Sequence, residues 1–212
     1  MSEYSRNEEI ANSLTHGIGA ALALSGMILL IATALDRGDA WQLVSVSIYG
    51  VALLASLLAS TLYHALPRPG VKQILRKLDH AAIFLLIAGT YTPFTLVTLR
   101  GGWGWSLFGL VWAGALLGIA AELLLKRGRE IFRVTTCLLL GWVVLVALHP
   151  LVQRLELDGV LLLASGGLAF TVGVIFYLWE RLPFGHAVWH LFVLAGCGLH
   201  FWVVFRYVLA AT

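Results

Sequence analysis

Charged residues are scarce in this sequence. They make up 12% of the 212 residues, whereas soluble domains carry about 25%. A water-soluble globule of this composition would lack polar surface, so that class of protein is excluded. Cysteine is also rare. The two cysteines, Cys137 and Cys197, lie in apolar stretches, which argues against a disulfide framework and predicts two small buried apolar side chains.

Hydrophobic residues are abundant instead, at 60% of the chain. They form apolar runs, each near the roughly 20 residues that cross the hydrocarbon core of a bilayer. In lipid, backbone polar groups must be satisfied within the segment, so each run is predicted to be a helix. The sequence therefore predicts an all-α integral membrane protein, a seven-transmembrane-helix bundle. The predicted spans are about 17–35, 42–65, 79–99, 103–125, 132–152, 159–179 and 188–209.

These spans leave little of the chain outside the bundle. The remainder is a short polar N-terminal segment at 1–16, short loops and a tail at 210–212. The first apolar run is not interpreted as a signal peptide, because the segment before it is net acidic through Glu3, Glu8 and Glu9. Function is therefore expected to reside within the seven-helix domain at 17–209.

The distribution of Lys and Arg predicts the orientation in the membrane, because positively charged loops resist translocation. The N-terminal segment and the second, fourth and sixth loops carry most of these residues. This asymmetry predicts a cytoplasmic N-terminus and a C-terminus outside. The basic side holds Arg6, Arg68, Lys72, Arg76, Lys77, Lys126, Arg127, Arg129, Arg133 and Arg181, and the other side holds Arg37, Arg100, Arg154 and Arg206.

The net charge of +3 does not indicate a nucleic-acid partner. The basic residues are divided among short loops beside the membrane, a pattern that serves topology and contact with anionic headgroups. We therefore expect no nucleic-acid binding. The sequence gives no indication of the oligomeric state.

Polar residues within the spans are informative, because each costs several kcal/mol at membrane depth unless it has a partner. Ser60 and His64 are four residues apart at the inner end of span two, and His186 and His190 are four apart at the inner start of span seven. Residues at this spacing share one face of a helix. Asp79 begins span three at the same level. The predicted topology thus gathers five polar side chains in one cytoplasmic-side layer.

This combination is typical of a metal site. Two histidines four apart can bind one ion, and a third imidazole from another helix gives a three-histidine site with an open fourth position, which fits zinc best. The stretch from His186 to His190 contains no glutamate to act as base, unlike the zinc metalloproteases. Asp79 would take that part, and Ser60 would orient a water or bind a substrate carbonyl.

Each residue also has a simpler interpretation. His64 alone could be an interfacial histidine, Asp79 could neutralise Arg76 or Lys77, and Ser60 could hydrogen-bond the carbonyl four residues back. The metal site is favoured because the charge-derived topology places all five residues on one side independently.

The motifs resemble those of the hemolysin III branch of the progestin and adipoQ receptor family. The resemblance covers about residues 9–205 and agrees in motif order, spacing and topology. A further segment near span one, which includes Asn12 and His16, either caps that span against the site or satisfies interfacial backbone groups. The motifs are Ser60-Thr-Leu-Tyr-His64, Lys77-Leu78-Asp79-His80, His186-Ala-Val-Trp-His190 with His200, Glu9-Ile-Ala-Asn12-Ser-Leu-Thr15-His16-Gly17, and Ala88-Gly89-Thr90-Tyr91-Thr92-Pro93.

The resemblance implies a seven-helix fold with His64, His186 and His190 as zinc ligands. It further implies that Asp79 contacts the zinc-bound water and that Ser60 belongs to the same motif as His64. Eukaryotic relatives are receptor-like proteins with ceramidase-type hydrolysis, and the wider superfamily includes alkaline ceramidases. The bacterial branch takes its name from a cytolytic phenotype and is linked to membrane homeostasis, which suggests a multi-pass protein of the bacterial inner membrane.

The function expected from these features is zinc-dependent hydrolysis of an amide or ester bond in a membrane lipid, similar to that of a ceramidase. The alternative is a non-enzymatic membrane-homeostasis or sensor protein in which zinc is structural. A pore-forming cytolysin is a weaker interpretation, because the polar groups cluster at one membrane level and do not line a continuous path.

Overall fold

A computed structural model describes residues 4–124, 129–179 and 181–209 of the chain. Those residues contain helices and turns and no strand, and seven helical segments are long and apolar enough to cross a membrane. The all-α, seven-helix prediction is confirmed. The helices are α1 (Arg6–Arg37), α2 (Ala40–Ala65), α3 (Pro69–Pro93), α4 (Gly102–Leu124), α5 (Arg129–Trp142), α6 (Leu148–Val152), α7 (Leu157–Leu178) and α8 (Gly185–Val203).

Three irregular turns lie within these spans. A π-helical turn, Phe94–Thr98, continues α3 immediately after Pro93, which has no N–H to donate to the helix ladder. A 3-10 turn, Val143–Ala147, joins α5 to the short α6, so these three pieces form one span. A second π-helical turn, Val204–Val208, extends α8.

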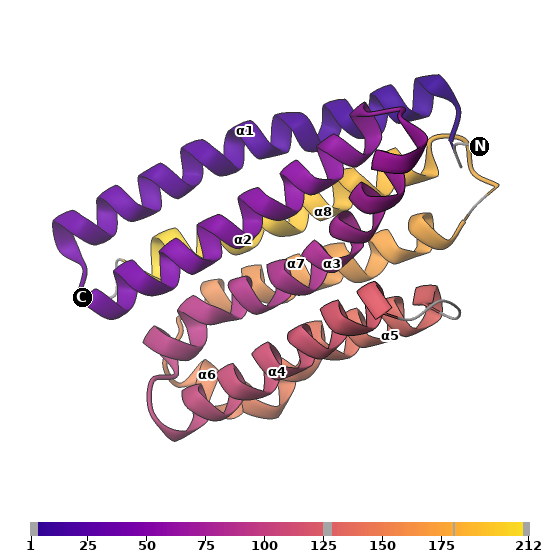
Figure 1. Cartoon of the computed structure of the whole chain (residues 1–212). Coiled ribbons are helices and arrows are strands. Elements are labelled where there is room, and N and C mark those ends of the chain that lie inside the picture. Colours follow the sequence, from indigo (N-terminus) through magenta and orange to yellow (C-terminus); the bar gives the residue numbers. More distant parts are fainter. Residues whose placement is uncertain (1–3, 125–128, 180, 210–212) are drawn as a thin grey trace.

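The helices form a closed bundle in which consecutive spans lie side by side. Helix α8 packs between α7 and α1, and α5 packs against α4 and α7. Figure 1 shows α1, α2 and α8 along one side of the bundle and α4 and α5 along the other. The two termini lie at opposite ends of the bundle, as an odd number of spans requires (Figure 1).

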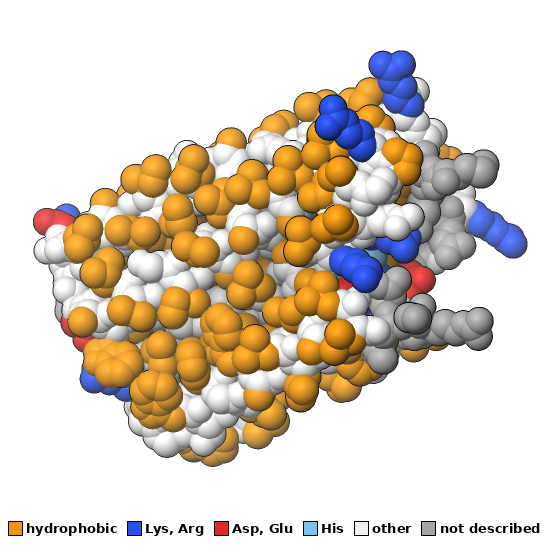
Figure 2. Space-filling model, viewed as in Figure 1, with side chains coloured by type: hydrophobic (Ala, Val, Ile, Leu, Met, Phe, Trp, Pro, Cys, Tyr) orange, Lys and Arg blue, Asp and Glu red, His pale blue; other side chains and the backbone are white. Residues whose placement is uncertain are grey.

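The outer surface is apolar along the length of the bundle. Leu117 is 70% exposed and Ile131 is 79% exposed, which would be costly in water and is ordinary against lipid. In Figure 2 hydrophobic side chains cover the long face, and Lys and Arg side chains gather at its ends. Which end faces the cytoplasm stays the prediction made from the loop charges.

Helix α1 begins at Arg6, well before the predicted start of span one near residue 17. The cause is a capping box. The Ser5 hydroxyl accepts a hydrogen bond from the Glu8 N–H, and the Glu8 carboxylate accepts one from the Ser5 N–H at 2.9 Å. Much of the expected polar segment is therefore helix. Its side chains lie beside the C-terminal end of α2 and the N-terminal end of α8.

Helix α3 also begins earlier than predicted. It starts at Pro69, a residue favoured in the first turn of a helix. Asp79, expected at the start of span three, therefore lies about three turns inside the helix. Lys72, expected in a loop, lies in the first turn of α3.

Small residues allow α4 to pack closely against its neighbours. A Cβ atom on Gly118 would lie 2.4 Å from the Phe84 ring of α3, and one on Gly114 would lie 2.7 Å from Leu140 of α5. These glycines thus serve packing inside the bundle.

Candidate metal centre

Three histidines come together between the C-terminal end of α2 and the N-terminal end of α8. His64 lies in the last turn of α2, and His186 and His190 lie in the first two turns of α8. Their candidate ligand atoms all lie within 4.8 Å of one another. His64 is 4% exposed and His190 is 1% exposed. The predicted trio is thus assembled in a buried position where it could hold a metal ion.

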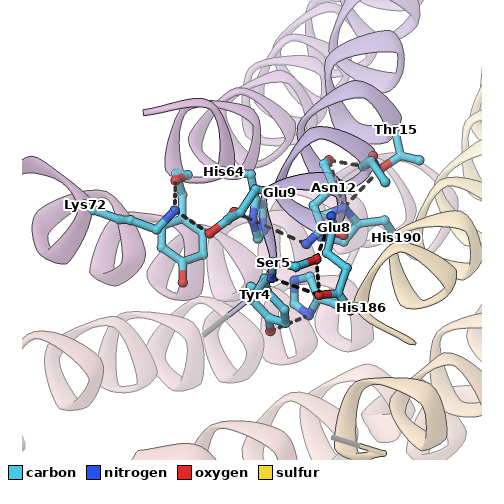
Figure 3. Close-up of polar contacts among 12 residues, drawn as sticks. Tyr4, Ser5, Glu8, Glu9, Asn12, Thr15, His64, Lys72, His186 and His190 are labelled. Carbon is cyan, nitrogen blue, oxygen red and sulfur yellow. Dashed lines mark hydrogen bonds and ion pairs between the residues drawn. The ribbon is translucent and has the colours of Figure 1, made fainter. Parts of the chain in front are cut away.

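The Nδ1 atoms of these histidines face hydrogen-bond partners on the N-terminal part of the chain (Figure 3). His64 Nδ1 lies 2.7 Å from Glu9 Oε2, and His190 Nδ1 lies 3.1 Å from the Asn12 carbonyl oxygen. A carboxylate and a carbonyl only accept, so each Nδ1 carries the hydrogen and each Nε2 carries a lone pair. His186 Nδ1 lies 3.1 Å from the Tyr4 hydroxyl. This is the arrangement that metal-binding histidines adopt.

The free side of His64 supports this interpretation. Within the described part of the chain, its buried Nε2 has no hydrogen-bond partner. A buried polar atom without a partner is unusual and requires an explanation such as an ion or a water. A metal ion bound by the three Nε2 atoms would satisfy it.

The turn before α8 helps to fix the position of His186. Phe184 adopts a left-handed conformation with φ 58°, and its N–H donates to Glu8 Oε1 at 3.0 Å. Non-glycine residues adopt this conformation at a cost, usually where the surrounding structure enforces it. Glu8 of α1 therefore helps to fix the chain two residues before His186.

A cavity of about 170 Å³ lies next to the histidines. Its lining includes Ser60, Asp79 and His16, together with many apolar side chains of α3, α5, α7 and α8. Ser60 is buried, and its hydroxyl makes no hydrogen bond of ordinary geometry among the described residues. The structure thus gathers all five predicted site residues at one place, while the role of each stays a prediction.

Asn12 and His16 lie within α1 and face the histidines, and the choice between a role at the site and a purely structural role stays a prediction. The Asn12 carbonyl accepts from His190, and its side-chain nitrogen lies 3.5 Å from His64 Nδ1. The His16 ring stacks on His190 with centroids 3.5 Å apart. Neither nitrogen of His16 has a partner within the described residues. Sequence reasoning did not identify Tyr4 or Glu9, although the spacing of Glu9, Asn12 and His16 places them on one helix face.

A second polar cluster, missed from the sequence, borders the same cavity. Arg133 of α5 donates to the Glu122 carboxylate of α4 at 3.1 Å and to the Tyr177 hydroxyl of α7. His80 Nδ1 lies 3.2 Å from Glu122. The spacing of Glu122 and Lys126 also predicts an ion pair along the helix, but Lys126 lies outside the described residues. The cluster links α3, α4, α5 and α7 inside the bundle.

Comparison with known proteins agrees with this architecture. A family model described as Haemolysin-III related matches residues 4–201. Hemolysin-3 of Bacillus cereus is 48% identical over 203 residues, which cover 95% of this chain and 92% of that protein. The Hemolysin-3 homolog of Bacillus subtilis (strain 168) is 43% identical over 200 residues, which cover 94% of each.

A more distant relative is the Monocyte to macrophage differentiation factor of Homo sapiens, which is 27% identical over 208 residues covering 94% of this chain and 84% of that protein. The seven spans and the family match fit a multi-pass protein of the bacterial inner membrane. The chain belongs to the haemolysin III-related family, the family indicated by its sequence motifs.

Proposed function

We propose that this chain is a zinc-dependent hydrolase of an amide or ester bond in a membrane lipid. The observation that carries the proposal is the trio of His64, His186 and His190, of which His64 and His190 are buried and His186 is partly buried, and whose candidate ligand atoms lie within 4.8 Å of one another. Imidazole nitrogens at about 2.0–2.1 Å from one tetrahedral zinc lie roughly 3.4 Å apart, so small side-chain movements would complete the site. Three protein ligands with an open fourth position are typical of catalytic zinc.

The cavity supports a lipid substrate. It is lined largely by apolar side chains, including Leu86, Phe170 and Val193, and its lining also includes His186 and His190. An acyl chain would lie against the apolar side chains, which would place the bond to be cleaved near the histidines. Burial of the reacting bond would also exclude bulk water and strengthen electrostatic interactions there.

Asp79 and Ser60 supply the other chemical groups. When bound, zinc would polarise the substrate carbonyl and lower the pKa of water toward about 7. The Asp79 carboxylate would accept the proton of the attacking water and later return it to the leaving amine or alcohol. The Ser60 hydroxyl, which lines the same cavity, would donate a hydrogen bond to the carbonyl oxygen or orient the water.

A non-enzymatic role in membrane homeostasis or sensing is the second candidate, and one observation favours it. The histidines come from α2 and α8, and their hydrogen-bond partners come from α1 and the residues before it. An ion bound there would hold α1, α2 and α8 together, as a structural zinc does. The five predicted site residues gather at one place in the bundle, which argues against a pore.

Hydrolysis of lipid amides and esters by the purified protein distinguishes the two candidates. The Asp79→Asn variant keeps the shape of the side chain and removes the base. We expect zinc to remain bound and hydrolysis to be reduced by at least 10²-fold, within the range of about 10²–10⁴ that general bases contribute. Full hydrolysis by this variant would exclude Asp79 as the base. Zinc binding without hydrolysis of any lipid by the wild type would favour the structural role.

A further inference from the structure

The start of α1 and the residues just before it contact all three histidines. Tyr4, Glu9 and Asn12 each contact a different histidine, at distances of 3.1, 2.7 and 3.1 Å from its Nδ1 atom. Figure 3 shows Tyr4 beside His186, Glu9 beside His64 and Asn12 near His190. Residues 4–12, which the sequence alone shows as a polar segment before span one, therefore supply hydrogen-bond partners to the candidate metal centre.

Glu9 makes the shortest of these contacts and is itself firmly held. One carboxylate oxygen lies 2.7 Å from His64 Nδ1, and the other lies 2.7 Å from the Lys72 ammonium group. Lys72 also donates to the Tyr63 carbonyl at 3.1 Å and lies over the Tyr63 ring. The Glu9 side chain is only 11% exposed and that of His64 is fully buried. Both oxygens of Glu9 are thus fixed by partners on α2 and α3.

A carboxylate in this position has two effects on a histidine ligand. It fixes the hydrogen on Nδ1 and the orientation of the ring, so that the Nε2 lone pair is directed at the ion. It also increases the basicity of Nε2, because the carboxylate stabilises positive charge that the ring acquires on binding a cation. Charge-assisted hydrogen bonds of this kind are roughly twice as strong as neutral ones.

We propose that Glu9 is a positioning residue that holds His64 with Nε2 toward the metal and thereby sets the affinity of the site for zinc. The inference rests on the proposed zinc centre and adds a residue to it. Lys72 contributes by holding the second oxygen of Glu9, which prevents the carboxylate from rotating away from His64.

The alternative is that Glu9 only stabilises the fold through its ion pair with Lys72. Two substitutions separate these roles. Glu9→Ala removes the carboxylate, and Glu9→Gln keeps its shape and one hydrogen bond while removing the charge. The matched control is Asp36→Asn, which removes a carboxylate at the other end of α1, where the Asp36 side chain is 71% exposed and pairs with Arg37.

The experiment is a zinc titration of the full chain in detergent, in competition with a chelator of known affinity, with the thermal stability of the zinc-free protein measured in parallel. We expect Glu9→Ala to weaken zinc binding by about 10–100-fold, the usual effect of removing such a partner. Glu9→Gln should weaken it by less, and Asp36→Asn should leave it unchanged. Because Glu9→Gln preserves the shape of the site, it remains informative even if Glu9→Ala does not fold.

The outcomes are distinct. Wild-type zinc affinity in both Glu9 variants would overturn the inference and leave the zinc centre standing, and lower stability of their zinc-free forms would then assign Glu9 to the fold. Equal weakening by Asp36→Asn and Glu9→Gln would also overturn it, since a general effect of removing a carboxylate from α1 would explain both. A wild-type protein that binds no zinc would overturn the proposed centre itself.

Discussion

Replacing Glu122 with leucine should destabilise the protein strongly. The Glu122 carboxylate lies 3.1 Å from the Arg133 guanidinium, and the two side chains are 3% and 6% exposed. The substitution would leave the arginine charge buried beside His80 and Tyr177. Removing one partner of a buried ion pair costs about 3–5 kcal/mol, because the other charge is left uncompensated.

The double substitution Glu122→Leu with Arg133→Met is the decisive control. It removes both charges, and well-packed apolar residues in place of a buried pair are often neutral or stabilising. Unfolding in detergent, followed by temperature or denaturant, should show a large loss in the single variant and recovery in the double variant. A single variant as stable as the wild type, or a double variant as unstable as the single, would refute the reasoning.

Two further predictions concern the metal and the packing. Zinc added at 100 times its dissociation constant should stabilise the wild type by about 2.7 kcal/mol, measured as a shift in Tm. The His64→Ala variant should be stabilised much less, and an equal shift in both proteins would show that His64 is not a ligand. Gly118→Val should lower the free energy of unfolding by about 1–3 kcal/mol through overlap with the Phe84 ring. Gly109→Val on the same helix should have little effect, because a Cβ atom there meets nothing within 4 Å. Equal Tm values for the two variants would contradict this packing.

The spans were predictable from the sequence because lipid imposes one simple requirement, a helix of sufficient apolar length. Their starts were less predictable, since hydropathy does not register polar helical turns. Helix α1 continues to Arg6 through the capping box of Ser5 and Glu8, and α3 continues to Pro69 through its favourable first turn. Both signals are local and lie outside the apolar runs.

The histidine trio was predictable because spacing and topology each constrain where the three side chains lie. His186 and His190 share a helix face by their spacing alone, and the charge pattern brings His64 to the same level. The contacts of Glu9 with His64 and of Glu122 with Arg133 were not predictable in this way. They join helices whose relative rotation depends on packing, which neither hydropathy nor loop charge specifies.

Metal content is the most direct test of the central claim that three histidines hold zinc. The protein is purified in detergent without chelators, and zinc is measured by mass spectrometry in the wild type and in the His186→Ala, His190→Ala double variant. We predict about one zinc per chain in the wild type and its loss in the double variant. A wild type without zinc, or a double variant that retains it fully, would contradict the account.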